Sequence, residues 1–209
     1  MAPELSELVE PSHTALLVLE CQRGVVGDLS GLPELAAEAA PVLAKIDALA
    51  STARQAGLRI VHCTAERRAD GLGANSNTRL FEHMARARNP LLTGSQAAQI
   101  VPEIRVADGD LVLPRLHGLS PFHGTELDAI LRNQQVTTVI ATGVSVNVAV
   151  QNLTFDAVNA SYQVVIPRDA VAGFPGAYVD AVFEHTLRAL ATIVEASELI
   201  ETWESNADR

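Results

Sequence analysis

The stretch "VIATGVSVNVAVQNLTFDA", residues 139–157, joins an unbroken apolar run to an amphipathic one through Gly143. The first part lacks the alternation of a half-exposed strand, which is typical of a strand buried on both faces. In the second part, apolar side chains recur at helical spacing. They are Val146, Val150, Leu153 and Ala157. The stretch therefore predicts a buried strand, a tight turn and a helix, and such turns in α/β proteins hold reactive side chains or anions.

The same alternation of apolar runs and amphipathic stretches extends along the whole chain. Six strands are predicted, at residues 14–20, 58–63, 110–114, 136–143, 162–170 with its exit loop, and 192–196. Helices are predicted at residues 32–57, 78–88, 124–134, 146–160, 178–191 and 197–206. Strict alternation and right-handed crossovers favour an α/β fold, a three-layer α/β/α sandwich with a mainly parallel six-stranded sheet. The first and fourth strands should be adjacent at its centre, because neither alternates.

Two predicted helices carry local signals. Pro41 lies inside the helix at 32–57 and should kink it or split it in two. Thr125 and Asp128 have the spacing of a capping box at the start of the helix at 124–134.

Composition limits the class of protein. The 209 residues are 48% apolar and suit one globular domain, residues 1–209, because domains usually have roughly 100–200 residues. A net charge of −10 argues against nucleic acid or an anionic membrane as a partner. No apolar run approaches the length that spans a bilayer, and the acidic N-terminus is unlike a signal peptide. We expect a cytoplasmic protein, with Cys21 and Cys63 as buried free thiols in a reducing compartment.

Ligands of open α/β sheets bind at the carboxyl ends of the strands. The residues that follow the predicted strands are therefore the candidates for a site: 20–22, 63–66, 115–123, 143–149 and 168–169.

Four of these segments together resemble the isochorismatase-like hydrolase superfamily, which includes isochorismatases, nicotinamidases and related amidases. They are "TALLVLECQRGVV" (14–26), "SPFHGTELDAIL" (120–131), "VIATGVSVNVAVQNLTFDA" (139–157) and "YQVVIPRDAVAG" (162–173). Each alone is a weak signal, but their order and spacing cover about residues 13–195.

The family's catalytic trio is an aspartate after the first strand, a lysine near the end of the third and a cysteine in the helix after the turn. This sequence departs from it at all three positions. Glu20 stands at the aspartate position and Ala149 at the cysteine position. Arg115 is the nearest substitute for the lysine, or Leu116 if the register slips by one, since the only lysine is Lys45 on the first long helix.

Without a thiolate at position 149, a covalent acyl intermediate cannot form there, so amidase chemistry of the cysteine type is not expected. The family also contains isochorismatases that lack the cysteine and protonate a vinyl ether from the first-strand carboxylate. The resemblance thus implies a non-covalent hydrolase of a small molecule, with Glu20 as general acid. The alternatives are an inactive member that binds a small molecule or has a structural role, and a Glu20 that only caps neighbouring backbone.

Further residues are candidates for binding the substrate, each with an ordinary structural alternative. They are Gln22, His117, Phe122, His123, Val144, Ser145 and Asn147. The histidines can be solvated loop residues, Phe122 core, and Ser145 and Asn147 helix-capping residues. By resemblance, the Val144–Ser145 peptide bond is expected to be cis.

We expect no metal and no cofactor. The segment "HCTAERRADG" (62–71) follows the second strand where nicotinamidase-like members hold a metal, and one histidine with one cysteine is not a zinc set. A homo-oligomer, a dimer or tetramer, is expected because family members commonly pair and because Leu91 and Leu92 look exposed in the irregular segment at 64–108.

Overall fold

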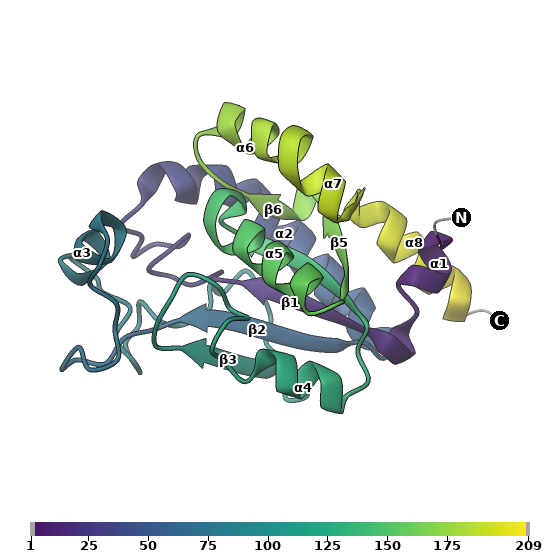
Figure 1. Ribbon diagram of the computed structural model, residues 1–209, viewed down its shortest axis with the longest axis horizontal. Coiled ribbons are helices and arrows are strands. Elements are labelled where there is room, and N and C mark those ends of the chain that lie inside the picture. Colours follow the sequence, from purple (N-terminus) through teal and green to yellow (C-terminus); the bar gives the residue numbers. More distant parts are fainter. Residues whose placement is uncertain (1–2, 208–209) are drawn as a thin grey trace.

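The computed structural model describes residues 3–207. Its strands are β1 (Thr14–Leu19), β2 (Arg59–Ala65), β3 (Leu111–Arg115), β4 (Thr138–Val144), β5 (Gln163–Pro167), β6 (Val171–Ala172) and β7 (Thr192–Val194). They form one parallel sheet in the order β3-β2-β1-β4-β5-β7, and the short β6 pairs with the end of β4 (Figure 1). β1 and β4 are adjacent, as predicted, and every residue of both is buried. The sheet has one short strand more than the six that the sequence predicted.

Helices lie on both faces of this sheet (Figure 1). They are α1 (Leu5–Leu8), α2 (Pro33–Gln55), α3 (Arg79–Ala85), α4 (Leu127–Asn133), α5 (Gln151–Asn159), α6 (Gly176–Val182), α7 (Arg188–Leu190) and α8 (Ala196–Ala207). Short 3-10 or π turns complete the set: η1 (Pro11–His13), η2 (Val146–Val150), η3 (Arg168–Ala170) and η4 (Phe183–Leu187).

Two apolar cores flank the sheet, and the alternating side chains of β1 enter both. Leu16 and Val18 pack in the core formed with α2 and α8, whereas Leu17 and Leu19 pack in the core formed with α4, α5 and α6. Because a strand directs successive side chains to opposite faces, an unbroken apolar run is needed where both faces are covered. The three-layer α/β/α prediction is confirmed.

Two local predictions need correction. α2 is not split at Pro41, which lies inside one continuous helix, and buried Ala39 and Leu43 on either side of the proline hold both parts of the helix against the sheet. The capping box is not formed, because Glu126 is the N-cap of α4 and its side chain makes no capping bond. The hydroxyl of Thr125 accepts from the N–H of Leu127, not from that of Asp128, and donates to the carbonyl oxygen of Pro121.

The turn after β4 requires a glycine. Gly143 has a φ of +95°, and a Cβ atom built on it would lie 2.3 Å from the carbonyl oxygen of Leu19 in β1. The following Val144–Ser145 bond is cis, as the resemblance implied. The close approach of Gly143 to Leu19 brings the carboxyl ends of β1 and β4 together at the end of the sheet where the candidate site lies.

A cluster of charged and polar side chains around Asp110 holds the start of β3 against α2 and β2. Asp110 accepts hydrogen bonds from Nε and Nη2 of Arg54, at 2.9 and 2.7 Å, and from the backbone N–H of Ala107, and its Oδ2 lies 3.1 Å from Nε2 of His62. Burial opposes ionisation of Asp110, but these donors outweigh it and lower its pKa to about 2. Burial lowers the pKa of His62 despite the neighbouring carboxylate.

Stability should therefore fall in two steps on acidification. His62 has a lowered pKa, so the unfolded chain binds a proton below about pH 6.5 while the folded chain resists it. Asp110, with its pKa of about 2, contributes about 2 kcal/mol to the free energy of unfolding at pH values above its unfolded pKa of about 4, and this contribution is lost as the pH falls towards 2.

Melting temperatures from pH 8 to 2 would show the second step in the native chain and not in Asp110→Asn. Asp70→Asn, at an exposed pair, should keep it, and equal profiles for the native chain and Asp110→Asn would contradict the assignment.

Candidate active site

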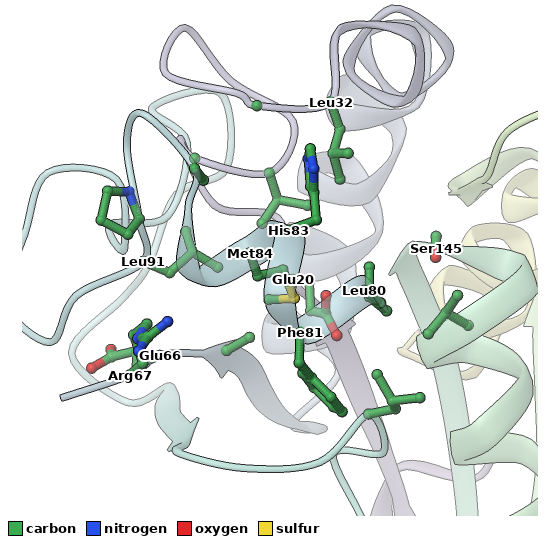
Figure 2. Close-up of a pocket in the computed structure, with 18 of the residues that line it drawn as sticks. Glu20, Leu32, Glu66, Arg67, Leu80, Phe81, His83, Met84, Leu91 and Ser145 are labelled. Carbon is green, nitrogen blue, oxygen red and sulfur yellow. The ribbon is translucent and has the colours of Figure 1, made fainter. Parts of the chain in front are cut away.

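A cavity of about 300 Å³ lies at the carboxyl ends of the central strands (Figure 2). Five of the residues singled out from the sequence line it: Glu20, Arg115, His117, Ser145 and Asn147. They come from three separate parts of the chain, after β1, at the end of β3 and after β4. The cavity therefore lies where the topology of an open α/β sheet places a ligand.

Glu20 and Arg115 form an ion pair at this cavity. Nη2 of Arg115 donates to Oε1 of Glu20 over 2.6 Å, and the two side chains are only 6% and 16% exposed for Arg115 and Glu20. Nη1 of the same guanidinium is buried and has no hydrogen-bond partner within residues 3–207. The arginine contacts the carboxylate, while the side chain of Leu116 lines the cavity without a polar group. The arrangement favours Arg115 over Leu116 as the substitute for the family's lysine, which stays a prediction.

The backbone of Glu20 is held in an unusual conformation. Its φ is +50°, in the left-handed region that side-chain-bearing residues seldom adopt, and its N–H donates to the carbonyl oxygen of Cys63 in β2 over 2.9 Å. Strained residues of this kind occur preferentially at functional sites, where the surrounding structure determines them. The conformation fixes where the carboxylate points.

Gln22 is not brought to the cavity. It is fully buried, and its amide makes three hydrogen bonds to backbone: Nε2 to the carbonyl oxygens of Ala65 and Ala98, and Oε1 from the N–H of Ala65. These bonds attach the end of β2 to the segment near residue 98, so Gln22 supports the wall of the site rather than its ligand.

Two of the four candidate residues in the turn after β4 line the cavity. Ser145 and Asn147 line the cavity, whereas Val144 and Ala149 are buried at 0% and 1% exposure and do not. Ser145 is the N-cap of η2 but makes no side-chain capping bond, and Nδ2 of Asn147 donates to the carbonyl oxygen of Phe174 over 3.4 Å. The position expected to hold a nucleophile thus carries a methyl group packed against the protein.

One of the three candidate residues in the loop after β3 lines the cavity. His117 is exposed and lines the cavity, but His123 is exposed and does not. Phe122 is a core residue, with its ring edge-on to Tyr162 at 5.5 Å between centroids. The hydroxyl of Ser120 accepts from the N–H groups of Phe122 and His123 and holds this turn.

Neither Lys45 nor the two thiols supply the missing catalytic groups. Nζ of Lys45 pairs with Oδ2 of Asp169 at 2.7 Å, at the exit of β5, and does not line the cavity. Cys21 and Cys63 are free and buried, and burial raises the pKa of each thiol to about 12. Within residues 3–207 no three His, Cys, Asp or Glu side chains are grouped as metal ligands, and no helix combines the length and apolar character needed to cross a bilayer.

The sequence missed the apolar wall opposite Glu20, most of which comes from the segment read as irregular. It includes Leu32, Leu35, Leu80, Phe81, Met84 and Leu91. The signal was the apolar triplet Leu80, Phe81 and Met84 on one side of the short α3. Leu91, taken as exposed, is only 9% exposed and packs in a core, whereas Leu92 is half-buried. The reason offered for a homo-oligomer was therefore wrong for Leu91, and the oligomer itself stays a prediction.

Comparison with known proteins agrees with this fold. The family model described as "Isochorismatase domain" matches residues 14–198. The ureidoacrylate amidohydrolase RutB of Cronobacter turicensis is 31% identical over 191 residues, 83% of this chain and 81% of that protein. The structure of N-carbamoylsarcosine amidase from Thermoplasma acidophilum is 25% identical, with a TM-score of 0.70 over 88% of this chain and 96% of that one. That of a cysteine hydrolase from Pseudomonas syringae pv. phaseolicola 1448A, 22% identical, has a TM-score of 0.83 over 98% and 99%. The chain belongs to the isochorismatase-like superfamily.

Proposed function

We propose that this protein is a hydrolase that acts on a small molecule without a covalent intermediate, with Glu20 as the general acid. The observation that carries the proposal is the Glu20–Arg115 ion pair, held at a cavity whose nucleophile position is the buried methyl group of Ala149. Named relatives that hydrolyse small molecules, such as RutB, support the reaction class.

The proposed step is the hydrolysis of a vinyl ether. Glu20 is a carboxylate in its pair with Arg115, so it first takes up a proton from solvent. The resulting carboxylic acid transfers this proton to the terminal vinyl carbon, and the double-bond electrons form the new C–H bond. Water adds to the resulting oxocarbenium carbon and returns a proton to the Glu20 carboxylate. The adduct then breaks its C–O bond to release an alcohol and a carbonyl compound.

Arg115 has an electrostatic part in this step. A guanidinium keeps its proton at any ordinary pH, so Arg115 cannot relay protons as a lysine does. Its bond to Oε1 stabilises the carboxylate that forms when Glu20 gives up its proton. The unpartnered Nη1 leaves one donor for an oxygen of the substrate.

A second candidate function is a small-molecule binding protein without catalysis. It is favoured by the same Ala149 and by Lys45, which is paired with Asp169 rather than with the site. The cavity and its ion pair would then serve recognition alone.

A turnover screen against vinyl ethers and amides tests the proposal and should find hydrolysis that does not depend on thiols. Because the raised pKa of about 12 and full burial keep Cys21 and Cys63 unreactive, iodoacetamide should leave the folded enzyme active. Cys21→Ser and Cys63→Ser should keep the rate within a few-fold. Loss of activity on alkylation without unfolding would overturn the non-covalent mechanism, and no turnover of any compound would favour the binding protein.

A further inference from the structure

The wall of the cavity that faces Glu20 is mostly apolar, although His83 of α3 also lines it. Leu80, Phe81 and Met84 of α3 line the same cavity as Glu20, and Figure 2 draws them around its carboxylate. Leu32 and Leu35, from the start of α2, and Leu91 extend this surface. A ligand whose polar group reaches Glu20 and Arg115 must therefore place the rest of its body against hydrocarbon.

α3 leaves these side chains at least partly exposed, although Met84 also packs against the core on the α2 side of the sheet. The structure describes α3 in full, and none of its residues is buried; Leu80 is 38% exposed. In the ribbon α3 stands at the end of the molecule away from the two termini (Figure 1). Apolar side chains grouped on a partly exposed wall mark binding sites more often than chance exposure.

The charges of the cavity disfavour an anion. Three carboxylates line it, those of Glu20, Glu34 and Glu66, against two guanidinium groups, those of Arg67 and Arg115, and two imidazoles, those of His83 and His117. Arg115 is already paired with Glu20. While the histidines are neutral, carboxylates outnumber guanidinium groups, so an acidic ligand would meet at least as much repulsion as attraction there.

We propose that the substrates are small neutral molecules with an alkyl or aryl body and one polar hydrolysable head, and that Leu80 and Phe81 of α3 select them. The inference rests on the proposed function in so far as it calls these molecules substrates. The binding preference itself can be tested without turnover. The volume of about 300 Å³ is at the lower end for ligand pockets and suits a compact molecule.

Binding of neutral primary amides to the native protein tests the substrate class, measured by NMR chemical-shift titration. Hexanamide should bind about 15-fold more tightly than butanamide, because each buried methylene contributes about 4-fold. Adipamate, in which a carboxylate replaces the terminal methyl group of hexanamide, should bind at least about 10-fold more weakly than hexanamide. Equal affinity for all three, or preference for adipamate, would overturn the proposal.

Two variants of α3 test the assigned residues, and the chain offers a matched control for each. Leu80→Ala and Phe81→Ala should weaken hexanamide by about 10-fold and butanamide by less than about 3-fold. Leu72→Ala and Phe155→Ala remove the same side chains at exposed positions, 67% and 44%, that do not line the cavity, and should change neither affinity. Unchanged hexanamide binding in both α3 variants would contradict the assignment.

Product analysis on the same samples separates this inference from the proposed function. Chain-length-dependent binding without turnover of any compound would support the apolar site and reject the hydrolase. Turnover that ignores the apolar body would support the hydrolase and reject the inference.

Discussion

Replacing Glu20 with glutamine is expected to lower the turnover rate by about 10²–10⁴-fold, the usual contribution of a general acid. Glutamine has the size of glutamate and can still accept the hydrogen bond from Nη2 of Arg115, now 2.6 Å from Oε1. It has no transferable proton. The rate constant on the best compound from the screen measures the effect, and full activity in Glu20→Gln would contradict the proposed mechanism.

The ion pair makes stability the main control for this variant. Arg115 is 6% exposed, and removing the partner of a buried charge costs up to about 3–5 kcal/mol. Glu20→Gln should therefore also melt at a lower temperature, and the double variant Glu20→Gln with Arg115→Gln should recover part of the loss without recovering activity. Glu82→Gln, on the exposed side of α3 and outside the cavity lining, is the matched control and should change neither.

The fold could be predicted from the sequence where one physical cause dominates. Burial on both faces forces the unbroken apolar runs of β1 and β4, and the buried face of Val146, Val150, Leu153 and Ala157 follows from helical spacing alone. The capping box failed because other partners compete for its side chains. Asp128, for example, accepts from the hydroxyl of Tyr162, which is distant in the sequence, and pairs with Arg132 one helical turn later.

The candidate site divides in the same way. Glu20, Arg115 and the turn at Ser145 follow directly from strands, so the rule for parallel sheets is enough to bring them together. Phe122 and Gln22 also lie near strand ends, but whether a side chain faces the cavity or the core depends on packing that no short pattern encodes. The wall from α3 comes from a short helix whose place depends on tertiary contacts.

Replacing Gly143 with alanine is expected to remove most or all of the folded protein. A φ of +95° costs a residue with a side chain about 1–2 kcal/mol, and the new Cβ would lie 2.3 Å from the carbonyl oxygen of Leu19 and 2.8 Å from its nitrogen. Those atoms belong to the backbone of the central strand, so β1 and β4 must separate. Since the free energy of unfolding of a domain is only about 5–15 kcal/mol, the cost of such a displacement is comparable to the whole stability of the protein.

Gly57→Ala is a control that distinguishes the strain of a positive φ from the steric clash of the new Cβ atom. Gly57 follows α2 with a φ of +88°, and a Cβ atom there would meet nothing within 4 Å. Gly57→Ala should therefore cost only the conformational strain, about 1–2 kcal/mol in urea denaturation followed by circular dichroism. Gly143→Ala should either fail to accumulate as soluble protein or unfold at far lower urea. Equal denaturation midpoints for the two variants would mean that β1 and β4 can separate at their ends, and that the turn tolerates a side chain where the structure leaves no room for one.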